Sequence, residues 1–246
     1  MTPEANDTPT PPPTKTPLTP LSVGSARPGQ NAYVFETTTG VTIRYWLYLP
    51  ENFDPNQKWP LILFLHGSEE RGETIERVKA QPLPKLLDAD TNFPFVVVSP
   101  QLPYGYWNDY IDPLEELLTY LEGISLVDGN RMYLTGLSLG GFGAWEYALR
   151  YPNRFAAVAP IAGGYIFQSE EVPEDICKLK NLPIWVFHGE KDNSVKFYQS
   201  QVLVDALEAC NADVKFTLYP EADHQTSWLK AYADPALSEW FLSHSK

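Results

Sequence analysis

MYLTGLSLGGFG, residues 132–143, is the segment from which the fold of this chain is most readily predicted. An apolar, β-prone run leads into Gly136-Leu137-Ser138-Leu139-Gly140, and a helix-compatible segment continues from there to Arg150. The two flanking glycines permit a very tight turn, because a side chain at either position would collide with the neighbouring strand or helix. Such a turn pushes the Ser138 hydroxyl out of the backbone, at the positive end of the helix that follows. The stretch therefore predicts a strand, a sharp turn with one projecting serine, and a helix.

Outward from this turn, short apolar runs alternate with helical patterns. The runs are typical of strands buried on both faces and cover 61–65, 95–99, 132–135, 156–161, 184–187 and 214–218. The helical patterns cover 75–87 (interrupted), 113–122, 141–151, 195–210 and 228–243. Residues 33–38 and 41–49 flank Thr39-Gly40 and predict an antiparallel hairpin. The alternation predicts an α/β fold with a mostly parallel sheet of about eight strands, flanked by helices.

Composition limits the partners of the chain. Its 246 residues suffice for one domain with a full core, and 43% of them are hydrophobic. The net charge of −13 argues against nucleic acid or an anionic membrane surface as a partner. No apolar run is long enough to span a bilayer, so we expect no membrane insertion.

The first thirty residues differ from the rest. Seven prolines and six threonines fall within Met1–Pro20, a composition that cannot bury a core. We predict a disordered tether over 1–30 and a single domain over 31–246. Pro/Thr tethers resemble the stalks of secreted or surface-anchored bacterial proteins, so we expect an extracellular or cell-surface protein whose targeting segment preceded Met1. A cytosolic protein with a flexible tail stays open as the alternative.

Two cysteines are present, Cys177 and Cys210. Neither has a metal-type partner at short spacing, so we expect no metal site. In a parallel sheet both would precede strands, on the side away from the loops at the carboxyl ends. They would then be placed to form a structural disulfide, which is consistent with export. Two independent buried thiols remain the equal alternative.

Polar residues follow several of the predicted strands. Ser68 comes after the run at 61–65, Ser138 after 132–135, Asp192 after 184–187 and His224 after 214–218. In a parallel sheet, functional residues gather on loops at the carboxyl ends of the strands. A serine hydroxyl becomes a nucleophile only beside a base, and the base needs an acceptor that orients it. One edge of the sheet thus presents a serine, an acid and a histidine in that chain order.

From residue 33 onward the chain resembles the α/β-hydrolase superfamily. Four segments carry the resemblance: His66-Gly-Ser-Glu-Glu-Arg-Gly72, Gly136-Leu-Ser-Leu-Gly-Gly141, Phe187-His-Gly-Glu-Lys-Asp192 and Ala222-Asp-His224. The chain looks most similar to compact esterases related to the feruloyl and polyhydroxybutyrate-type esterases, and to prolyl-oligopeptidase-like hydrolases. The resemblance implies the α/β-hydrolase fold. It also makes Ser138 the nucleophile, Asp192 the orienting acid and His224 the general base.

Each of these roles has a competitor in the sequence. His66 and His188 directly precede glycines at strand ends, where histidines more often brace a loop. Asp223 adjoins His224 and cannot readily turn back onto the same imidazole.

An oxyanion hole needs two backbone donors. The resemblance assigns them to the N–H groups of Leu139 and Ser68, with Glu69 as the alternative to Ser68. The Arg71 side chain is expected to hold this loop.

The sequence also bears on the shape of the substrate site. Lipases of this fold commonly cover the site with a cap after the strand at 156–161, but here only 162–183 separates that strand from the next. We expect no sizeable cap and an open site. Aromatic residues near the site stack well on sugars and phenolic acids. Trp107 and Trp228 are the predicted pocket walls, and Glu69 is a predicted substrate contact.

Three functions are consistent with these features. The first is a serine carboxylesterase acting on short-chain, aromatic or acetyl esters, including esters of plant-wall polysaccharides. The second is a peptidase of the prolyl-oligopeptidase type, and the third is a non-catalytic carbohydrate-binding surface domain. For the esterase we expect a monomer, no cofactor, and a small or polymer-attached ester as the only partner.

Overall fold

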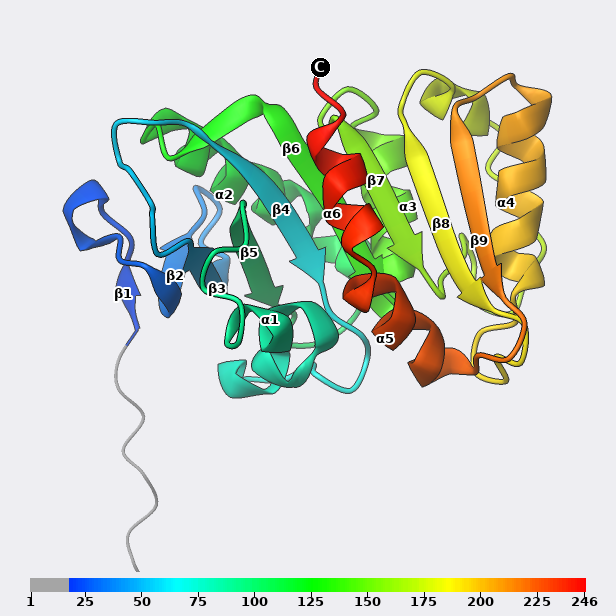
Figure 1. Ribbon diagram of the computed structural model, residues 1–246, viewed down its shortest axis with the longest axis horizontal. Coiled ribbons are helices and arrows are strands. Elements are labelled where there is room, and N and C mark those ends of the chain that lie inside the picture. The colour runs from blue at the N-terminus through cyan, green and yellow to red at the C-terminus, as the bar shows by residue number, and fades with distance from the viewer. Residues whose placement is uncertain (1–17) are drawn as a thin grey trace, which may run out of the picture.

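The computed structural model describes residues 18–246, in which nine strands form one sheet (Figure 1). Its strand order is β1-β2-β3-β5-β4-β6-β7-β8-β9. The bounds are β1 Thr19–Pro20, β2 Gly29–Glu36, β3 Thr42–Leu49, β4 Trp59–Leu65, β5 Val96–Gln101, β6 Val127–Leu137, β7 Ala157–Ile161, β8 Ile184–Gly189 and β9 Val214–Tyr219. β3 is antiparallel to both of its neighbours, and every other neighbouring pair is parallel. The predicted hairpin and the mostly parallel sheet are confirmed.

Apolar runs form the centre of the sheet because it is covered on both faces. Every residue of β5, β7 and β8 is buried, so these strands read as continuous apolar sequence rather than as an alternating pattern. Their carboxyl ends, with those of β4, β6 and β9, lie at the lower edge of the sheet in Figure 1. The loops at this edge hold the polar residues that the sequence singled out.

Helices cover the two faces in separate groups. One face carries α2 (Ile111–Gly123), α3 (Leu139–Arg150) and α4 (Tyr198–Ala209), and the other carries α1 (Pro82–Leu87), α5 (His224–Ala233) and α6 (Pro235–Leu242) (Figure 1). Four short 3₁₀ turns complete the described chain: η1 Val23–Ser25, η2 Ile75–Ala80, η3 Trp107–Tyr110 and η4 Ile176–Leu179. No helix within residues 18–246 combines the length and the hydropathy that a membrane crossing requires.

Two of the predicted helices have wrong boundaries, and the one expected from 228 already begins at His224. The single helix expected over 228–243 is two helices, because Pro235 drives Asp234 into an extended conformation and Asp234 then caps α6 by accepting from Ala236 N at 2.9 Å. The helix expected from Val195 begins only at Tyr198. The backbone before it is drawn into a turn by Asp192, whose Oδ1 accepts from the N–H groups of Ser194 and Val195.

The predicted tether is wrong over its described part, and residues 1–17 lie outside the described residues. Thr19 and Pro20 pair with Tyr33 and Val34 as the two-residue strand β1, which the sequence prediction lacked. Leu21 is buried, and its carbonyl accepts from Tyr120 Oη at 2.5 Å. One apolar residue in a proline-rich stretch is enough to anchor this segment, so the domain includes residues 18–30.

The two cysteines form a disulfide, with their Cα atoms 5.6 Å apart. Cys177 lies in η4 before β8, and Cys210 follows α4 before β9. The bond therefore ties together the segments that enter two neighbouring strands, at the sheet edge away from the polar loops. Of the two alternatives left open by the sequence, the disulfide is confirmed.

Candidate active site

Ser138 occupies the turn between β6 and α3 with φ 52° and ψ −118°, a strained backbone conformation for a residue with a side chain. The flanking glycines are required by close contacts. A Cβ on Gly136 would lie 2.3 Å from the Gly140 carbonyl oxygen, and a Cβ on Gly140 would lie 1.9 Å from that of Leu65. The crowding predicted from the sequence is therefore present on both sides of the turn. It directs the serine side chain outward at the start of α3.

Three side chains from separate loops meet in one hydrogen-bonded chain. The Ser138 hydroxyl donates to His224 Nε2 at 2.9 Å, and His224 Nδ1–H donates to Asp192 Oδ2 at 2.6 Å. His224 is the first residue of α5, and Asp192 lies in the loop after β8. Asp223 instead caps α5 by accepting from Thr226 N at 2.8 Å. The structure thus brings together the serine, histidine and acid that the sequence predicted.

Asp192 is almost fully buried and is surrounded by donors. Its Oδ1 accepts from the backbone of Ser194 and Val195, and its Oδ2 lies 3.3 Å from His188 Nε2 as well as next to His224. Burial raises the pKa of Asp192, but the hydrogen bonds from His188, His224 and Val195 N outweigh it and hold this pKa below its usual range. An ionised acceptor at this place fixes the His224 tautomer that leaves Nε2 free to take a proton from Ser138.

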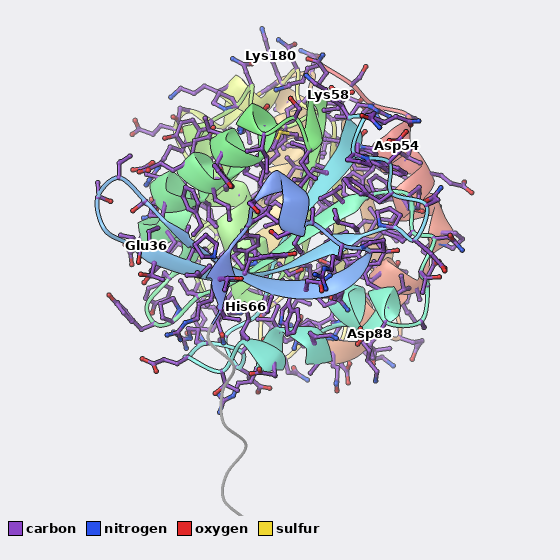
Figure 2. The ribbon with its side chains drawn as sticks, turned by 90° about the vertical axis from the view of Figure 1, so that its left-hand side faces the viewer. Glu36, Asp54, Lys58, His66, Asp88 and Lys180 are labelled. Atoms are coloured by element: carbon purple, nitrogen blue, oxygen red, sulfur yellow. A yellow bond between two sulfur atoms is a disulfide. The ribbon has the colours of Figure 1, made fainter. Side chains whose placement is uncertain are left out.

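The other two strand-end histidines brace loops, as predicted. His66 Nδ1–H donates to Gly67 O at 2.6 Å, and His66 Nε2 accepts from Leu102 N at 2.9 Å. Burial lowers the pKa of His66 to about 4, which keeps the ring neutral. Figure 2 shows His66 within the outline of the molecule, whereas Glu36 and Lys180 lie toward its periphery. His188 contacts Ser200 Oγ at 2.7 Å and donates to the Val195 carbonyl at 2.9 Å.

The loop after β4 is held firmly next to Ser138. Arg71 donates to the carbonyls of Ser68 and Gly105, each at 3.0 Å, which confirms its expected role in holding the loop. The buried Glu70 accepts from Gln81 Nε2 at 2.5 Å, and burial raises the pKa of this carboxyl. Ser68 and Leu139 both line the space beside Ser138. Leu139 is the first residue of α3, where a backbone N–H has no partner within the helix.

Ser138 lies between two cavities. The first, here called the aromatic cavity, has a volume of about 450 Å³ and its lining includes Tyr106, Trp107, Phe142, Glu146, Tyr165 and Phe167. The second, here called the histidine cavity, has a volume of about 490 Å³ and its lining includes Glu69, Glu70, Gln81, Lys85, His224 and Trp228. Ser68, Phe167 and Val195 border both cavities, so these residues form the rim around the serine.

The three predicted substrate contacts differ in which cavity they line and in how far they are exposed. Trp107 lines the aromatic cavity, but its side chain is only 1% exposed and its indole N–H donates to His66 O at 3.0 Å. Its main contact is therefore with the protein. Trp228 packs its ring 4.7 Å from the ring of His224, and Glu69 is exposed on the histidine cavity.

Two acidic residues of the aromatic cavity, Asp109 and Glu146, were not predicted from the sequence. For Glu146 a signal exists: it follows Phe142 by four residues and Ser138 by eight, a spacing that puts all three on one helix face. Among residues 18–246, no group of three or more His, Cys, Asp or Glu side chains is arranged to hold a metal ion.

Comparison with known proteins identifies a family match. The model of the dienelactone hydrolase family matches residues 107–232, just over half of the chain. A protein of Escherichia coli (strain K12) named "Putative carboxymethylenebutenolidase" is 32% identical over 129 residues, which are 48% of this chain and 48% of that protein. Dipeptidyl-peptidase 5 of Porphyromonas gingivalis is 24% identical over 234 residues, which cover 77% of this chain and 34% of that protein. The chain thus spans about half or less of the length of these curated relatives.

Solved structures show the same fold. A thermostable esterase superimposes with a TM-score of 0.74 and 30% sequence identity, covering 88% of this chain and 63% of that one. Dipeptidyl peptidase 4 of Porphyromonas gingivalis superimposes with a TM-score of 0.70 and 15% identity, over 89% of this chain and 36% of that one. The second likeness concerns the fold alone. Both agree with an α/β-hydrolase fold, which the described residues form without a large cap.

Proposed function

Because the chain belongs to the dienelactone hydrolase family, we propose that it is a serine carboxylic-ester hydrolase with Ser138 as its nucleophile. The observation that carries this proposal is the hydrogen-bonded chain from Ser138 through His224 to the ionised, buried Asp192. A hydroxyl, a base and an orienting acid in this order are the arrangement that nucleophilic acyl transfer requires.

The reaction proceeds in two halves. His224 Nε2 takes the Ser138 proton while Oγ attacks the ester carbonyl carbon, and Asp192 stabilises the imidazolium that forms. The tetrahedral intermediate collapses, the alcohol leaves with the proton from Nε2, and an acyl group remains on Ser138. A water then gives a proton to His224 and attacks the acyl carbon. The second collapse releases the acid and returns the proton to Ser138.

Negative charge on the carbonyl oxygen needs donors that are already in place. We assign them to the N–H groups of Leu139 and Ser68, which both border the space beside Ser138. The bonds from Arg71 to Ser68 O and Gly105 O support this assignment, because they hold the loop after β4 against the next loop. Removing one such donor typically costs about 3 kcal/mol of transition-state stabilisation.

For substrates we propose short-chain, aromatic or acetyl esters, including those carried by plant-wall polysaccharides. Two observations support this range. Between β7 and β8 the structure has only η4 and loops, and the exposed aromatic side chains of Tyr106 and Phe167 line the aromatic cavity. The disulfide between Cys177 and Cys210 supports an extracellular or cell-surface location for what we propose is a monomer.

A peptidase remains the second candidate. The likeness to dipeptidyl-peptidase 5 favours it, but only 34% of that protein is covered. Amide cleavage also demands stronger protonation of the leaving group. A purely binding role is less consistent with the structure, because the hydrogen-bonded chain at Ser138 is complete.

The test is hydrolysis of p-nitrophenyl acetate and butyrate by the wild type and by Ser138→Ala. We expect the substitution to lower kcat by about 10³-fold or more, since the nucleophile is lost. Ser238→Ala, on α6, is the matched control and should keep the wild-type rate. Full activity in Ser138→Ala would overturn the proposal. Faster turnover of a prolyl p-nitroanilide than of either ester would favour the peptidase.

A further inference from the structure

Only one of the two cavities beside Ser138 is in contact with the general base. His224 borders the histidine cavity and does not border the aromatic cavity. On the proposed function, the alcohol must take its proton from His224 Nε2 as it leaves. The leaving alcohol therefore occupies the histidine cavity, and the acyl group extends into the aromatic cavity on the other side of the serine.

One face of α3 forms a wall of the aromatic cavity. Ser138 stands at the start of the helix, and Phe142 and Glu146 follow at intervals of four residues. Eight residues at 1.5 Å rise separate Ser138 from Glu146 by about 12 Å along the helix axis. Side chains lean toward the helix N-terminus, which brings the Glu146 carboxylate back toward the serine. An extended aryl acyl group can bridge this span, whereas an acetyl group cannot.

The Glu146 carboxylate has no hydrogen-bond or ion-pair partner within residues 18–246, although its side chain is half-buried. Its natural helical partner, Arg150, is engaged elsewhere: it donates to Asn108 Oδ1 at 2.8 Å and to Asp112 Oδ1 at 3.3 Å. Burial raises the pKa of Glu146, and Arg150 lowers it to a smaller extent. Because Glu146 lines the aromatic cavity and has no partner among residues 18–246, its carboxylate is free to accept a hydrogen bond from a group that enters the cavity.

We propose that Glu146 determines acyl specificity by accepting a hydrogen bond from a hydroxyl at the far end of an aryl acyl group. The ring of that group would lie among the aromatic side chains that line the cavity, including Phe142 and Tyr165. A hydroxyl on an aromatic ring matches the aromatic lining, and an aliphatic ammonium group is the competing donor, because two acidic residues (Asp109 and Glu146) and one basic residue (Arg71) line the cavity.

The experiment compares kcat/KM for methyl 4-hydroxycinnamate and methyl cinnamate, which differ only in the hydroxyl. The wild type should prefer the hydroxylated ester by about tenfold or more, since a hydrogen bond to a charged acceptor is lost with methyl cinnamate. Glu146→Leu should bring the ratio close to one, and Glu146→Gln should give an intermediate ratio. Glu208→Gln, an exposed site on α4, makes the same charge change and should leave the ratio unaltered. Hydrolysis of p-nitrophenyl acetate by each variant checks that the fold and the serine chemistry survive.

An unchanged ratio in Glu146→Leu, with both esters still hydrolysed, would overturn the inference while leaving the proposed function intact. A preference for methyl 6-aminohexanoate over both aryl esters, lost in Glu146→Gln, would overturn the choice of a hydroxyl. If no ester is hydrolysed at all, the proposed function fails, and calorimetry on Ser138→Ala still decides the inference. Methyl 4-hydroxycinnamate should bind to that variant more tightly than methyl cinnamate, and a further Glu146→Leu substitution should remove the difference.

Discussion

Among single residues, His66 couples the binding of a proton to the folding of the chain. Its two ring nitrogens are both engaged, one donating to Gly67 O and the other accepting from Leu102 N. A second proton on the ring would break the bond from Leu102 and place a charge in a buried site. The folded protein therefore holds the pKa of His66 at about 4, below its usual value of 6.5.

This shift predicts a loss of stability on acidification. Between pH 6.5 and pH 4 the unfolded chain binds a proton at His66 that the folded chain does not, so the free energy of unfolding falls as the pH drops. The total loss from this one group is about 3 kcal/mol, complete near pH 4 and absent above pH 6.5. Urea unfolding of the wild type and of His66→Asn across this range measures it. The stability gap between the two should narrow by that amount, and a gap that stays constant would show that His66 is not the titrating group.

Among elements, the contact of α3 with the sheet depends on small residues. Gly140 brings the helix against the Leu65 and His66 carbonyls at the end of β4, and Gly143 brings it against Trp107. This close approach holds the start of α3, and with it Ser138, at the edge of the sheet. The glycines that make the turn thus also position the helix.

We predict that Gly140→Ala destabilises the protein, because an added Cβ would lie 1.9 Å from Leu65 O and force α3 away from β4. Overpacking of this kind typically costs about 1–3 kcal/mol, and here displacement of Ser138 should lower esterase activity as well. Gly123→Ala in α2 is the matched control, since no atom lies within 4 Å of its added Cβ. That control should change the unfolding free energy by no more than about 1 kcal/mol, in the stabilising direction. Equal effects in urea unfolding of the two variants would contradict the packing explanation.

At the scale of the whole molecule, the sheet gathers the site on one edge and leaves it open. The residues between β7 and β8 form η4 and loops rather than a separate lid, and the disulfide ties that segment to the end of α4. Within the described part of the chain, residues 18–246, no separate lid covers the two cavities on either side of Ser138.

An uncovered site predicts hydrolysis without interfacial activation. The rate against p-nitrophenyl butyrate concentration should rise smoothly toward saturation and pass the solubility limit without an upward break, because no lid has to open at an interface. Kinetics measured across that limit check this expectation. A sharp increase in rate once the ester forms a separate phase would contradict it.

Local patterns predicted much of this structure. The buried strands, the hairpin at 33–49 and the sharp turn at Ser138 were all predictable, because each depends on residues close together in the chain. The order serine, acid, histidine followed from the rule that parallel strands end at a common edge. The helix break at Asp234-Pro235 could also have been predicted from the sequence, because a proline disfavours the helical conformation of the residue before it.

The α/β class, the turn at Ser138 and the chain order of the three residues that meet there could therefore all be predicted from the sequence. Three features became known only from the three-dimensional structure: Thr19–Pro20 joins the sheet, Cys177 bonds Cys210, and Glu146 lines the aromatic cavity with no partner among residues 18–246. Each of these depends on which surfaces meet after the helices pack on the sheet. Such contacts join residues far apart in the chain, where periodicity and motif spacing carry no information about distance.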